Sequence, residues 1–152
     1  MAIAKHLSEE GLQIVVLEKE KRSGESTSSR NSGVIHAGMY YPENSLKAKL
    51  CVEGNNLLYH YARKKNIPHK KIGKYIVSTN ESEEKKLIQI YENGKKNSVD
   101  LEIISKTDLK EKLPYLSAVS GIFSPNTGII DVPELIKSLE FDIWQNDGLI
   151  SF

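Results

Sequence analysis

The stretch LQIVVLE, residues Leu12–Glu18, decides the fold class of this chain of 152 residues. A nearly continuous apolar run of this kind is typical of a strand buried on both faces of a parallel sheet. Before it, Ala2–Glu10 predict a short helix, because Ile3 and Leu7 share one helical face and Gly11 suits a left-handed C-terminal cap. A helix that leads into such a strand is the second half of a βαβ unit, so we predict an α/β fold.

The residues after this strand predict a long loop and then a helix. Lys19–Tyr41 are rich in Ser, Gly, Asn and Arg and follow neither the helical nor the strand period, so we expect a loop with one short helical turn. Ser45 suits an N-cap, and the helix is expected to run from there to about Lys65. Gly54 inside it predicts close packing against a neighbouring element. The expected buried stripe of this helix consists of Leu46, Leu50, Leu57, Leu58 and Tyr61.

The second half of the chain predicts short elements of both kinds. β-Branched and aromatic residues favour strands, and charged apolar-periodic segments favour helices. The expected strands are Lys74–Thr79, Leu101–Ile104 and Gly121–Phe123, and the expected helices are Glu81–Lys96 and Thr107–Lys112. Asp131 and Glu134 then form a variant of the capping box at the entrance to another helix.

Composition and charge exclude several classes of function. The formal net charge of +1 gives no field that would attract nucleic acid. The single cysteine, Cys51, cannot form an internal disulfide, and a thiol that stays reduced predicts a cytoplasmic location. The first residues lack the apolar core of a signal peptide, and no stretch reaches the ~18 apolar residues of a membrane span. Peripheral contact with the inner membrane remains open.

Glu18 is the first candidate binding residue. It closes the apolar strand that follows a helix, which is where dinucleotide-binding folds place an acidic residue that accepts hydrogen bonds from an adenosine ribose. A strand-end glutamate that faces water is an equally good interpretation. The glycine-rich G-x-G-x-x-G turn that would bind a pyrophosphate is not found before Ala2.

Four sequence segments resemble one family of flavoenzymes. The run STSSRNSGVIHAGMYY, residues Ser26–Tyr41, is followed by LKAKLC at Leu46–Cys51, and further matches lie at Gly73–Val77 and Ser124–Asp131. Together they resemble the L-2-hydroxyglutarate oxidase/dehydrogenase family, a branch of the glycine-oxidase and D-amino-acid-oxidase type of FAD enzymes. The resemblance covers almost the whole chain, from Ala2 to about Gly148.

The resemblance implies a fold, a cofactor and a reaction. The expected fold is a partial Rossmann-like FAD-binding domain with part of an inserted antiparallel α+β substrate domain. Its expected divisions are 1–71 for the FAD-binding domain, 72–130 for the substrate domain and 131–152 for a return to the first. The expected reaction removes a hydride from C2 of L-2-hydroxyglutarate, giving 2-oxoglutarate and reduced flavin. The expected partners are this 2-hydroxy acid and an electron acceptor, either a quinone or oxygen.

The polar loop supplies most of the expected cofactor site. The side chains of Ser28, Ser29 and Asn31, with backbone amides of a glycine-bearing loop, suit a pyrophosphate, and Arg30 adds a cation. A solvated polar loop is the alternative interpretation. The full set of expected FAD-binding residues is Glu18, Ser28, Ser29, Arg30, Asn31, Gly33, Val34 and His36.

His36 is the candidate catalytic residue. Gly33 and Gly38 bracket it, and glycines allow a backbone to lie close to a planar ligand such as the flavin ring. The imidazole can accept the proton of the substrate hydroxyl as the hydride leaves, or it can only donate a hydrogen bond to flavin or substrate. The alternative is a histidine whose imidazole is satisfied by a loop carbonyl.

Other polar and aromatic residues give weaker indications. Tyr40 and Tyr41 can line a substrate pocket, although packing is the favoured role, and Lys47 and Lys49 can attract a dicarboxylate. The remaining histidines have no metal-ligand spacing, so we expect them at the surface and predict no metal site; they are His6, His60 and His69.

We expect the chain to be truncated at both ends. Met1 would then be a misassigned start or the edge of an interrupted gene, with a strand and a G-x-G-x-x-G turn encoded upstream and the remaining domains beyond Phe152. Two alternatives stay open. The complete protein can be a related FAD oxidase of another 2-hydroxy or amino acid, or the chain can be a catalytically inactive product whose exposed sheet edge promotes aggregation.

Overall fold

A computed structural model describes residues 1–152, which fold as two compact units. Unit 1 comprises Met1–Val34, Tyr61–His69 and Ile130–Phe152, and unit 2 comprises Ile35–His60 and Lys70–Ile129. The chain passes from one unit to the other within four elements, which are β2 (Val34–Ile35), α2 (Leu46–Lys64), β3 (His69–Lys70) and β7 (Gly128–Ile130). No helix combines the length and the apolar character needed to cross a bilayer.

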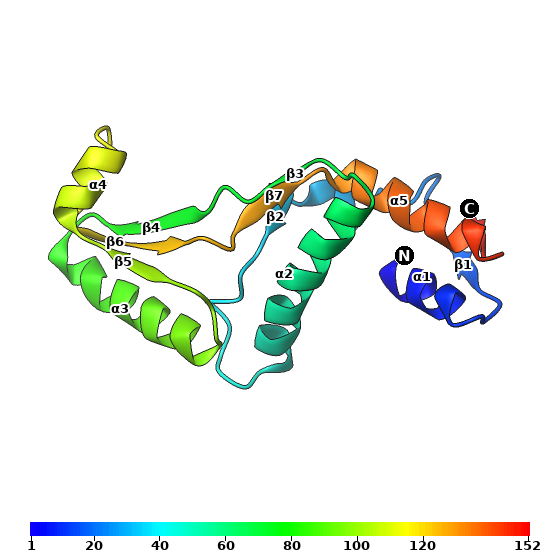
Figure 1. The fold of residues 1–152 in the computed structure, drawn as a ribbon, viewed down its shortest axis with the longest axis horizontal. Helices are drawn as coiled ribbons and strands as arrows, with labels where there is room; N and C mark the ends of the chain where they lie inside the picture. Colours follow the sequence, from blue (N-terminus) through cyan, green and yellow to red (C-terminus); the bar gives the residue numbers. More distant parts are fainter. The chain divides into compact units, whose positions relative to one another are not determined.

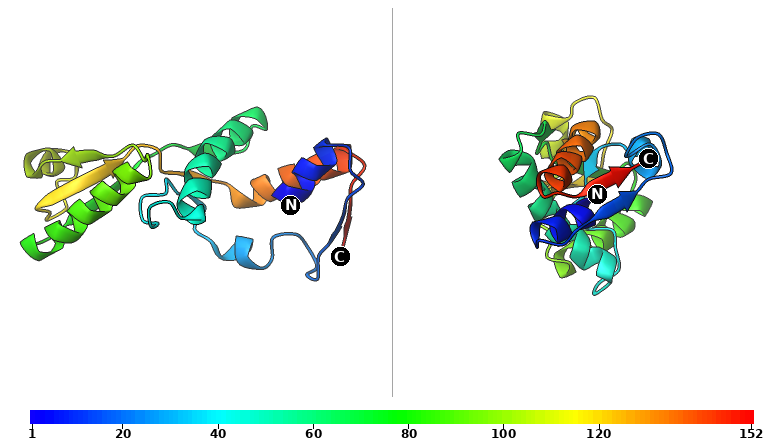
Figure 2. Two further views of the ribbon diagram at one scale, coloured as in Figure 1. Left: turned by 90° about the horizontal axis from the view of Figure 1, so that it is seen from below. Right: turned by 90° about the vertical axis from the view of Figure 1, so that its right-hand side faces the viewer.

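Unit 1 contains a parallel pair of strands. Strand β1 (Val15–Leu17) lies beside β8 (Leu149–Ser151), with Val15 opposite Leu149, and the two are visible side by side in the right-hand view of Figure 2. Helices α1 (Ala2–Glu9) and α5 (Val132–Gln145) pack against each other in the same unit. The predicted helix–strand sequence at the start of the chain is therefore confirmed.

The predicted burial of this first strand is wrong. Val15 and Leu17 are 60% and 81% exposed, and β8 is the one strand paired with β1. A continuous apolar run indicates a strand buried on both faces only where a layer of structure covers each face of the sheet. Within these residues neither Val15 nor Leu17 receives such a cover.

The start of α5 follows the predicted capping pattern. The side chain of Asp131 accepts a hydrogen bond from the backbone N–H of Glu134 at 3.0 Å, so Asp131 is the N-cap. Pro133 occupies the first turn, where a missing N–H costs nothing because that donor would have no intrahelical partner.

Unit 2 contains an antiparallel sheet with helices packed on it. The strand order is β4 (Lys74–Ser78), β6 (Ser120–Ser124) and β5 (Glu102–Ile104), with β6 in the centre. Figure 1 shows α3 (Glu81–Lys96) running along this sheet and α4 (Lys106–Lys112) at its end. Parallel strands in one unit and antiparallel strands in the other confirm the predicted α/β class with an antiparallel portion.

The core of unit 2 includes the segment after β2. Met39, in that segment, is 2% exposed, and Ile122 of the central strand is 1% exposed. One cluster of buried apolar side chains consists of Ala37, Met39, Leu87, Val99, Leu101 and Ile122. The backbone next to His36 is thus anchored by two side chains of its own segment.

Helix α2 begins as predicted but buries a different face. The Oγ atom of Ser45 accepts a hydrogen bond from the N–H of Ala48 at 3.1 Å, which confirms the N-cap. The predicted buried stripe is wrong, because Leu46, Leu50 and Leu57 are 70%, 56% and 68% exposed. The residues that α2 buries are instead small or hydrogen-bonding: Ala48, Asn55, Tyr59 and Ala62. Close packing at Gly54 is also not found, since a Cβ built there meets no atom within 4 Å.

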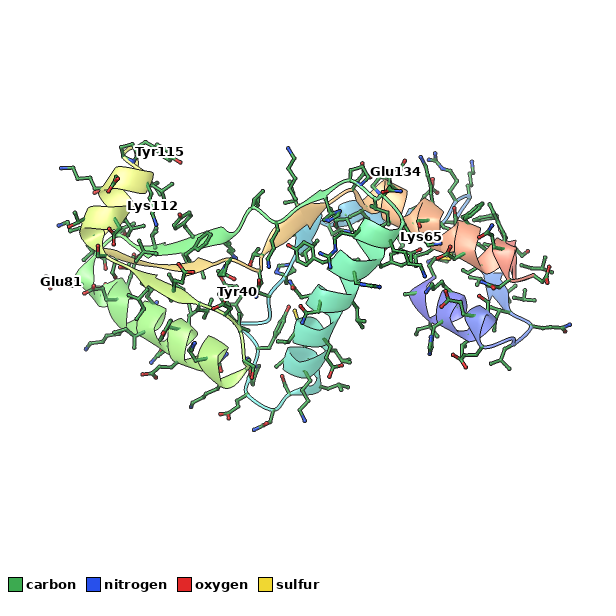
Figure 3. The ribbon with its side chains drawn as sticks, viewed as in Figure 1. Tyr40, Lys65, Glu81, Lys112, Tyr115 and Glu134 are labelled. Carbon is green, nitrogen blue, oxygen red and sulfur yellow. The ribbon has the colours of Figure 1, made fainter.

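A buried carboxylate joins the end of α2 to α5 within unit 1. Asp142 is 3% exposed and forms an ion pair with Lys65, whose position beside α5 can be followed in Figure 3. The hydroxyl of Tyr61 donates to Asp142 Oδ2 at 2.9 Å and lies 2.9 Å from Ser138 Oγ. Each oxygen of the Asp142 carboxylate therefore has a donor, as a buried charge requires.

This network predicts a pH dependence of stability. Burial raises the pKa of Tyr61 from 10.0 to about 12, and the carboxylate of Asp142 acts in the same direction. As the pH rises, the unfolded chain loses the tyrosine proton first, so the stabilisation is complete below the unfolded pKa and is lost between 10.0 and about 12. We expect Tyr61→Phe to have a shallower fall of unfolding free energy across this window in urea titrations. Equal slopes for the two proteins would contradict the assignment.

Candidate functional site

Glu18 stands at the carboxyl end of the parallel pair in unit 1. Its backbone N–H donates to the carbonyl of Ser151 at 2.8 Å, which extends the ladder of β1 and β8 by one bond. Its half-buried carboxylate accepts from the N–H of Glu20 at 3.0 Å. One such bond leaves acceptor capacity for a ligand hydroxyl, and the carboxyl ends of parallel strands are where open α/β sheets bind ligands.

The polar loop of unit 1 folds around its own side chains. The hydroxyl of Ser29 lies 2.7 Å from the Glu25 carbonyl, and the amide oxygen of Asn31 accepts from the N–H of Gly33 at 2.7 Å. The amide nitrogen of Asn31 donates to the carbonyl of Ser28. Ser29 and Asn31 therefore shape the loop, within the short helical turn η1 (Thr27–Arg30) and just after it.

Arg30 and the hydroxyl of Ser28 remain available to a ligand. Both residues are exposed, and the guanidinium of Arg30 makes no ion pair within the chain. A guanidinium and a hydroxyl are donors that suit phosphate oxygens. The donor set present on this loop thus fits the pyrophosphate of a dinucleotide.

Gly33 is required by the backbone of unit 1. Its φ is +66°, and a Cβ at this position would lie 2.8 Å from the carbonyl oxygen of Ile130. The N–H of Ile130 donates to the carbonyl of Gly33 at 2.9 Å. The close approach seen at Gly33 is therefore between two backbone segments, with half-buried Val34 following it.

An open cavity of about 430 Å³ lies between the polar loop and α5 in unit 1. Ser28 and Ser29 line it on the loop side, and Ile136 and Trp144 line it on the helix side. The sequence interpretation did not include two further cationic residues of its rim, Lys21 and Arg22. The run KEKR at positions 19–22, directly after the strand, is the signal that indicates them.

His36 presents an exposed imidazole in unit 2. No hydrogen bond or ion pair of the ring is found, so no loop carbonyl accepts from it. The carbonyl of the same residue is engaged, because it accepts from the Asn55 amide at 3.0 Å. The backbone is thus held while the ring remains able to exchange a proton with a ligand.

A small cavity next to His36 is lined by a lysine that the sequence did not single out. It is lined by residues of the His36 segment together with Lys74 and Thr127. The ammonium group of Lys74 lies 4.7 Å from the ring centroid of Tyr40, which Figure 3 labels, and that of Lys47 lies 4.6 Å from the ring of Tyr41. The motif match at Gly73–Val77 already contained Lys74, but only the fold places it beside the histidine.

The other titratable candidates do not form a site. The Nδ1 atom of His69 lies 2.7 Å from the Ile67 carbonyl, and His6 and His60 are exposed. No group of three or more His, Cys, Asp or Glu side chains is arranged to hold a metal ion. Burial raises the pKa of the Cys51 thiol, with a smaller opposing effect of Lys47, so this cysteine is a poor nucleophile.

Comparison with known proteins defines the class. Residues 1–146 match the family described as DAO, FAD dependent oxidoreductase, and the chain therefore belongs to that family. It is 50% identical over 138 residues to the mitochondrial L-2-hydroxyglutarate dehydrogenase of Nematostella vectensis, with 90% of this chain and 30% of the relative covered. The Arabidopsis thaliana and Homo sapiens enzymes of that name are 44% and 43% identical, covering 97% and 91% of this chain and 32% and 30% of theirs.

Solved structures share the fold of this chain. The L-alpha-glycerophosphate oxidase of Mycoplasma pneumoniae, solved with FAD bound, superposes with a TM-score of 0.91 at 29% identity, with 99% of this chain and 41% of that chain covered. Glycine oxidase from Geobacillus kaustophilus has a TM-score of 0.84 at 19% identity, over 99% of this chain and 42% of that one. The predicted family and its cofactor, FAD, are confirmed.

The predicted cytoplasmic location is wrong. The L-2-hydroxyglutarate dehydrogenases that match this chain are named as mitochondrial proteins. The prediction depended on a single reduced thiol, and such a thiol is compatible with any reducing compartment. It therefore does not distinguish the cytoplasm from the interior of a mitochondrion.

Proposed function

We propose that this chain is the segment of a flavoenzyme that oxidises L-2-hydroxyglutarate to 2-oxoglutarate. The observation that carries the proposal is the agreement among relatives, which are 39–50% identical over 90–97% of this chain and share the name L-2-hydroxyglutarate dehydrogenase. Because the chain spans about 30% of their length, the activity belongs to a complete enzyme.

The residues of the polar loop would hold the cofactor. The carboxylate of Glu18 would accept hydrogen bonds from a ribose, and Ser28 and Arg30 would bind phosphate oxygens. Ser29 and Asn31 would hold the conformation of the loop. Gly33 and Val34 would place their backbone next to the cofactor. When bound, FAD supplies the acceptor for the hydride that leaves C2 of the substrate.

His36 and Lys74 would act on the substrate. The imidazole of His36 would accept the hydroxyl proton while the C2–H bond breaks, so that the oxygen lone pair forms the new C=O bond. The ammonium of Lys74, held over Tyr40, would bind one carboxylate of the substrate. Lys47 and Lys49 are further exposed cations of the same unit, and Lys49 has the weaker case because only Lys47 lies over a tyrosine ring.

Domain division and electron acceptor follow from the same proposal. The parallel strands of unit 1 support an FAD-binding domain built from 1–71 and 131–152, and the antiparallel sheet supports a substrate domain at 72–130. Ile35–His60 belong to the proposed FAD-binding domain but pack within unit 2. The proposed domains therefore differ from the packing units at these residues. A FAD dehydrogenase needs an electron acceptor, for which we propose a quinone or oxygen, with peripheral membrane contact in the first case.

A hybrid enzyme tests the proposed function. It is made by replacing the matching segment of the Nematostella vectensis dehydrogenase with this chain. We expect reduction of the bound flavin by L-2-hydroxyglutarate, observed as bleaching under anaerobic conditions. Bleaching by glycine or by D-2-hydroxyglutarate instead would identify an oxidase of another amino acid or 2-hydroxy acid. A folded, flavin-containing hybrid that none of these reduces would support the inactive alternative.

The chain by itself should carry little flavin. No G-x-G-x-x-G turn occurs among its residues, so the backbone donors that bind a pyrophosphate most tightly are not in the 152-residue chain. We expect far less than one FAD per molecule in protein purified without added flavin. Absorbance of released flavin against protein concentration measures it, and stoichiometric yellow protein would show that the loop suffices.

A further inference from the structure

The segment that carries His36 makes its polar contacts through its carbonyl groups. His36–Tyr41 contains neither helix nor strand, so these carbonyls have no partners from regular secondary structure. Buried carbonyls require donors, and their loss is costly. The donors found here are side-chain amides of three asparagines, Asn55, Asn93 and Asn97.

Each asparagine donates twice from one amide nitrogen. Asn55 of α2 bonds the carbonyls of His36 at 3.0 Å and Asn126 at 2.9 Å. Asn93 of α3 bonds the carbonyls of Met39 at 2.7 Å and Tyr41 at 2.8 Å.

Asn97, at the end of α3, completes the set. It bonds the carbonyls of Gly38 at 3.2 Å and Tyr41 at 2.8 Å, so the Tyr41 oxygen uses both of its lone pairs. Gly38 itself has a φ of +100°, and a Cβ there would lie 3.0 Å from Val52 Cγ2. Side chains of α2 and α3 thus hold the segment, and at Gly38 there is little room for a larger residue.

We propose that Asn55, Asn93 and Asn97 form an amide clamp on the segment His36–Tyr41, and that Asn55 is the positioning residue for His36. The proposal rests on the proposed function for its catalytic half, since only there does His36 touch a substrate. Asn55 is 7% exposed and bonds the carbonyl of His36, whereas the imidazole is exposed and unengaged. The clamp fixes the backbone from which this imidazole reaches a ligand.

Asn→Asp substitutions test the clamp, because a carboxylate has nearly the same shape but accepts only. In Asn55→Asp, a carboxylate oxygen replaces the amide nitrogen that donates to the carbonyls of His36 and Asn126. Both hydrogen bonds are lost, and the new oxygen repels the two carbonyl oxygens. The matched control is Asn56→Asp, since exposed Asn56 donates only within α2, to the Val52 carbonyl. A second variant is Asn97→Asp, whose half-buried position is more tolerant of a charge.

The first measurement uses the 152-residue chain. In NMR relaxation of the backbone, we expect order parameters at residues 36–41 to fall from about 0.85 to below about 0.6 in Asn55→Asp and Asn97→Asp, with the strands of unit 2 unchanged. Asn56→Asp should match the unsubstituted chain. Unchanged order at residues 36–41 in both clamp variants would overturn the clamp, and if Asn55→Asp does not fold, Asn97→Asp decides.

The second measurement uses flavin reduction in the hybrid enzyme. Misplacement by about 1 Å can cost about 10²-fold, so Asn55→Asp should slow flavin reduction by roughly 10-fold to 10²-fold. Added to His36→Ala, it should cost almost nothing more, because a positioning residue acts through the group it positions. Independent, multiplying effects would overturn the positioning role. If His36→Ala alone changes nothing, the proposed role of His36 fails, and the order parameters still decide the clamp.

Discussion

His36→Ala in the hybrid enzyme should lower kcat/KM for L-2-hydroxyglutarate by roughly 10²-fold or more, a typical contribution of general acid–base catalysis. The physical reason is the loss of the group that accepts the hydroxyl proton as the hydride leaves. Steady-state kinetics measures the effect, and flavin absorbance shows whether the cofactor is still bound.

The control for this variant is His60→Ala. His60 is also exposed and lies on α2, but it lines neither of the cavities described next to the candidate residues. Its removal should leave turnover and flavin content as they were. Full flavin occupancy with unchanged turnover in His36→Ala would return His36 to the role of an ordinary loop residue.

Asp142→Ala should lower the free energy of unfolding of the chain by about 3 kcal/mol, the cost of removing one partner of a buried ion pair. It leaves Lys65, which is only 25% exposed, without its carboxylate partner, and the Tyr61 hydroxyl keeps only Ser138 Oγ. Such a loss is a large fraction of ordinary domain stability. Urea unfolding followed by circular dichroism measures it.

The control variant lies on the same helix. Glu134→Gln breaks the exposed pair of Glu134 with Lys137 but keeps the size of the side chain. Its unfolding midpoint should stay close to that of the unsubstituted chain, because exposed ion pairs contribute little. If both substitutions have equally small effects, the network at Asp142 does not fasten α2 to α5.

Local chemistry made much of the fold predictable from the sequence. Ser45 and Asp131 were recognised as N-caps because a capping side chain bonds the backbone only two or three residues away. The helix before Gly11 and the strand after it were also predictable from neighbouring residues, namely a glycine that suits a C-terminal cap and a continuous apolar run. Periodicity failed for α2, where Leu46 and Leu57 are exposed and buried Asn55 looked like an ordinary polar residue.

The candidate site was predictable only in part, because its contacts join distant positions. The two bonds of Asn55 span 19 and 71 residues, and no local pattern announces an asparagine that serves backbone carbonyls. Lys74 and Tyr40 are likewise 34 positions apart in the sequence, and only the folded chain brings the ammonium group to the ring. By contrast, the residues of the polar loop are contiguous, so the sequence alone places them together, and their role in binding FAD stays a prediction.

The amide clamp ties the chemical ageing of the chain to the order of one segment. Asn93 is followed by Gly94, and an asparagine before a glycine deamidates readily where the flexible glycine lets its backbone nitrogen attack the side-chain carbonyl. In α3 the helix and the two hydrogen bonds from the Asn93 amide hold both groups apart. Only an opening that unwinds this turn of α3 together with the clamp removes that protection, and the aspartate or isoaspartate that then forms cannot donate to the carbonyls of Met39 and Tyr41. Deamidation at Asn93 would therefore remove two hydrogen bonds from this segment irreversibly in each molecule that undergoes it.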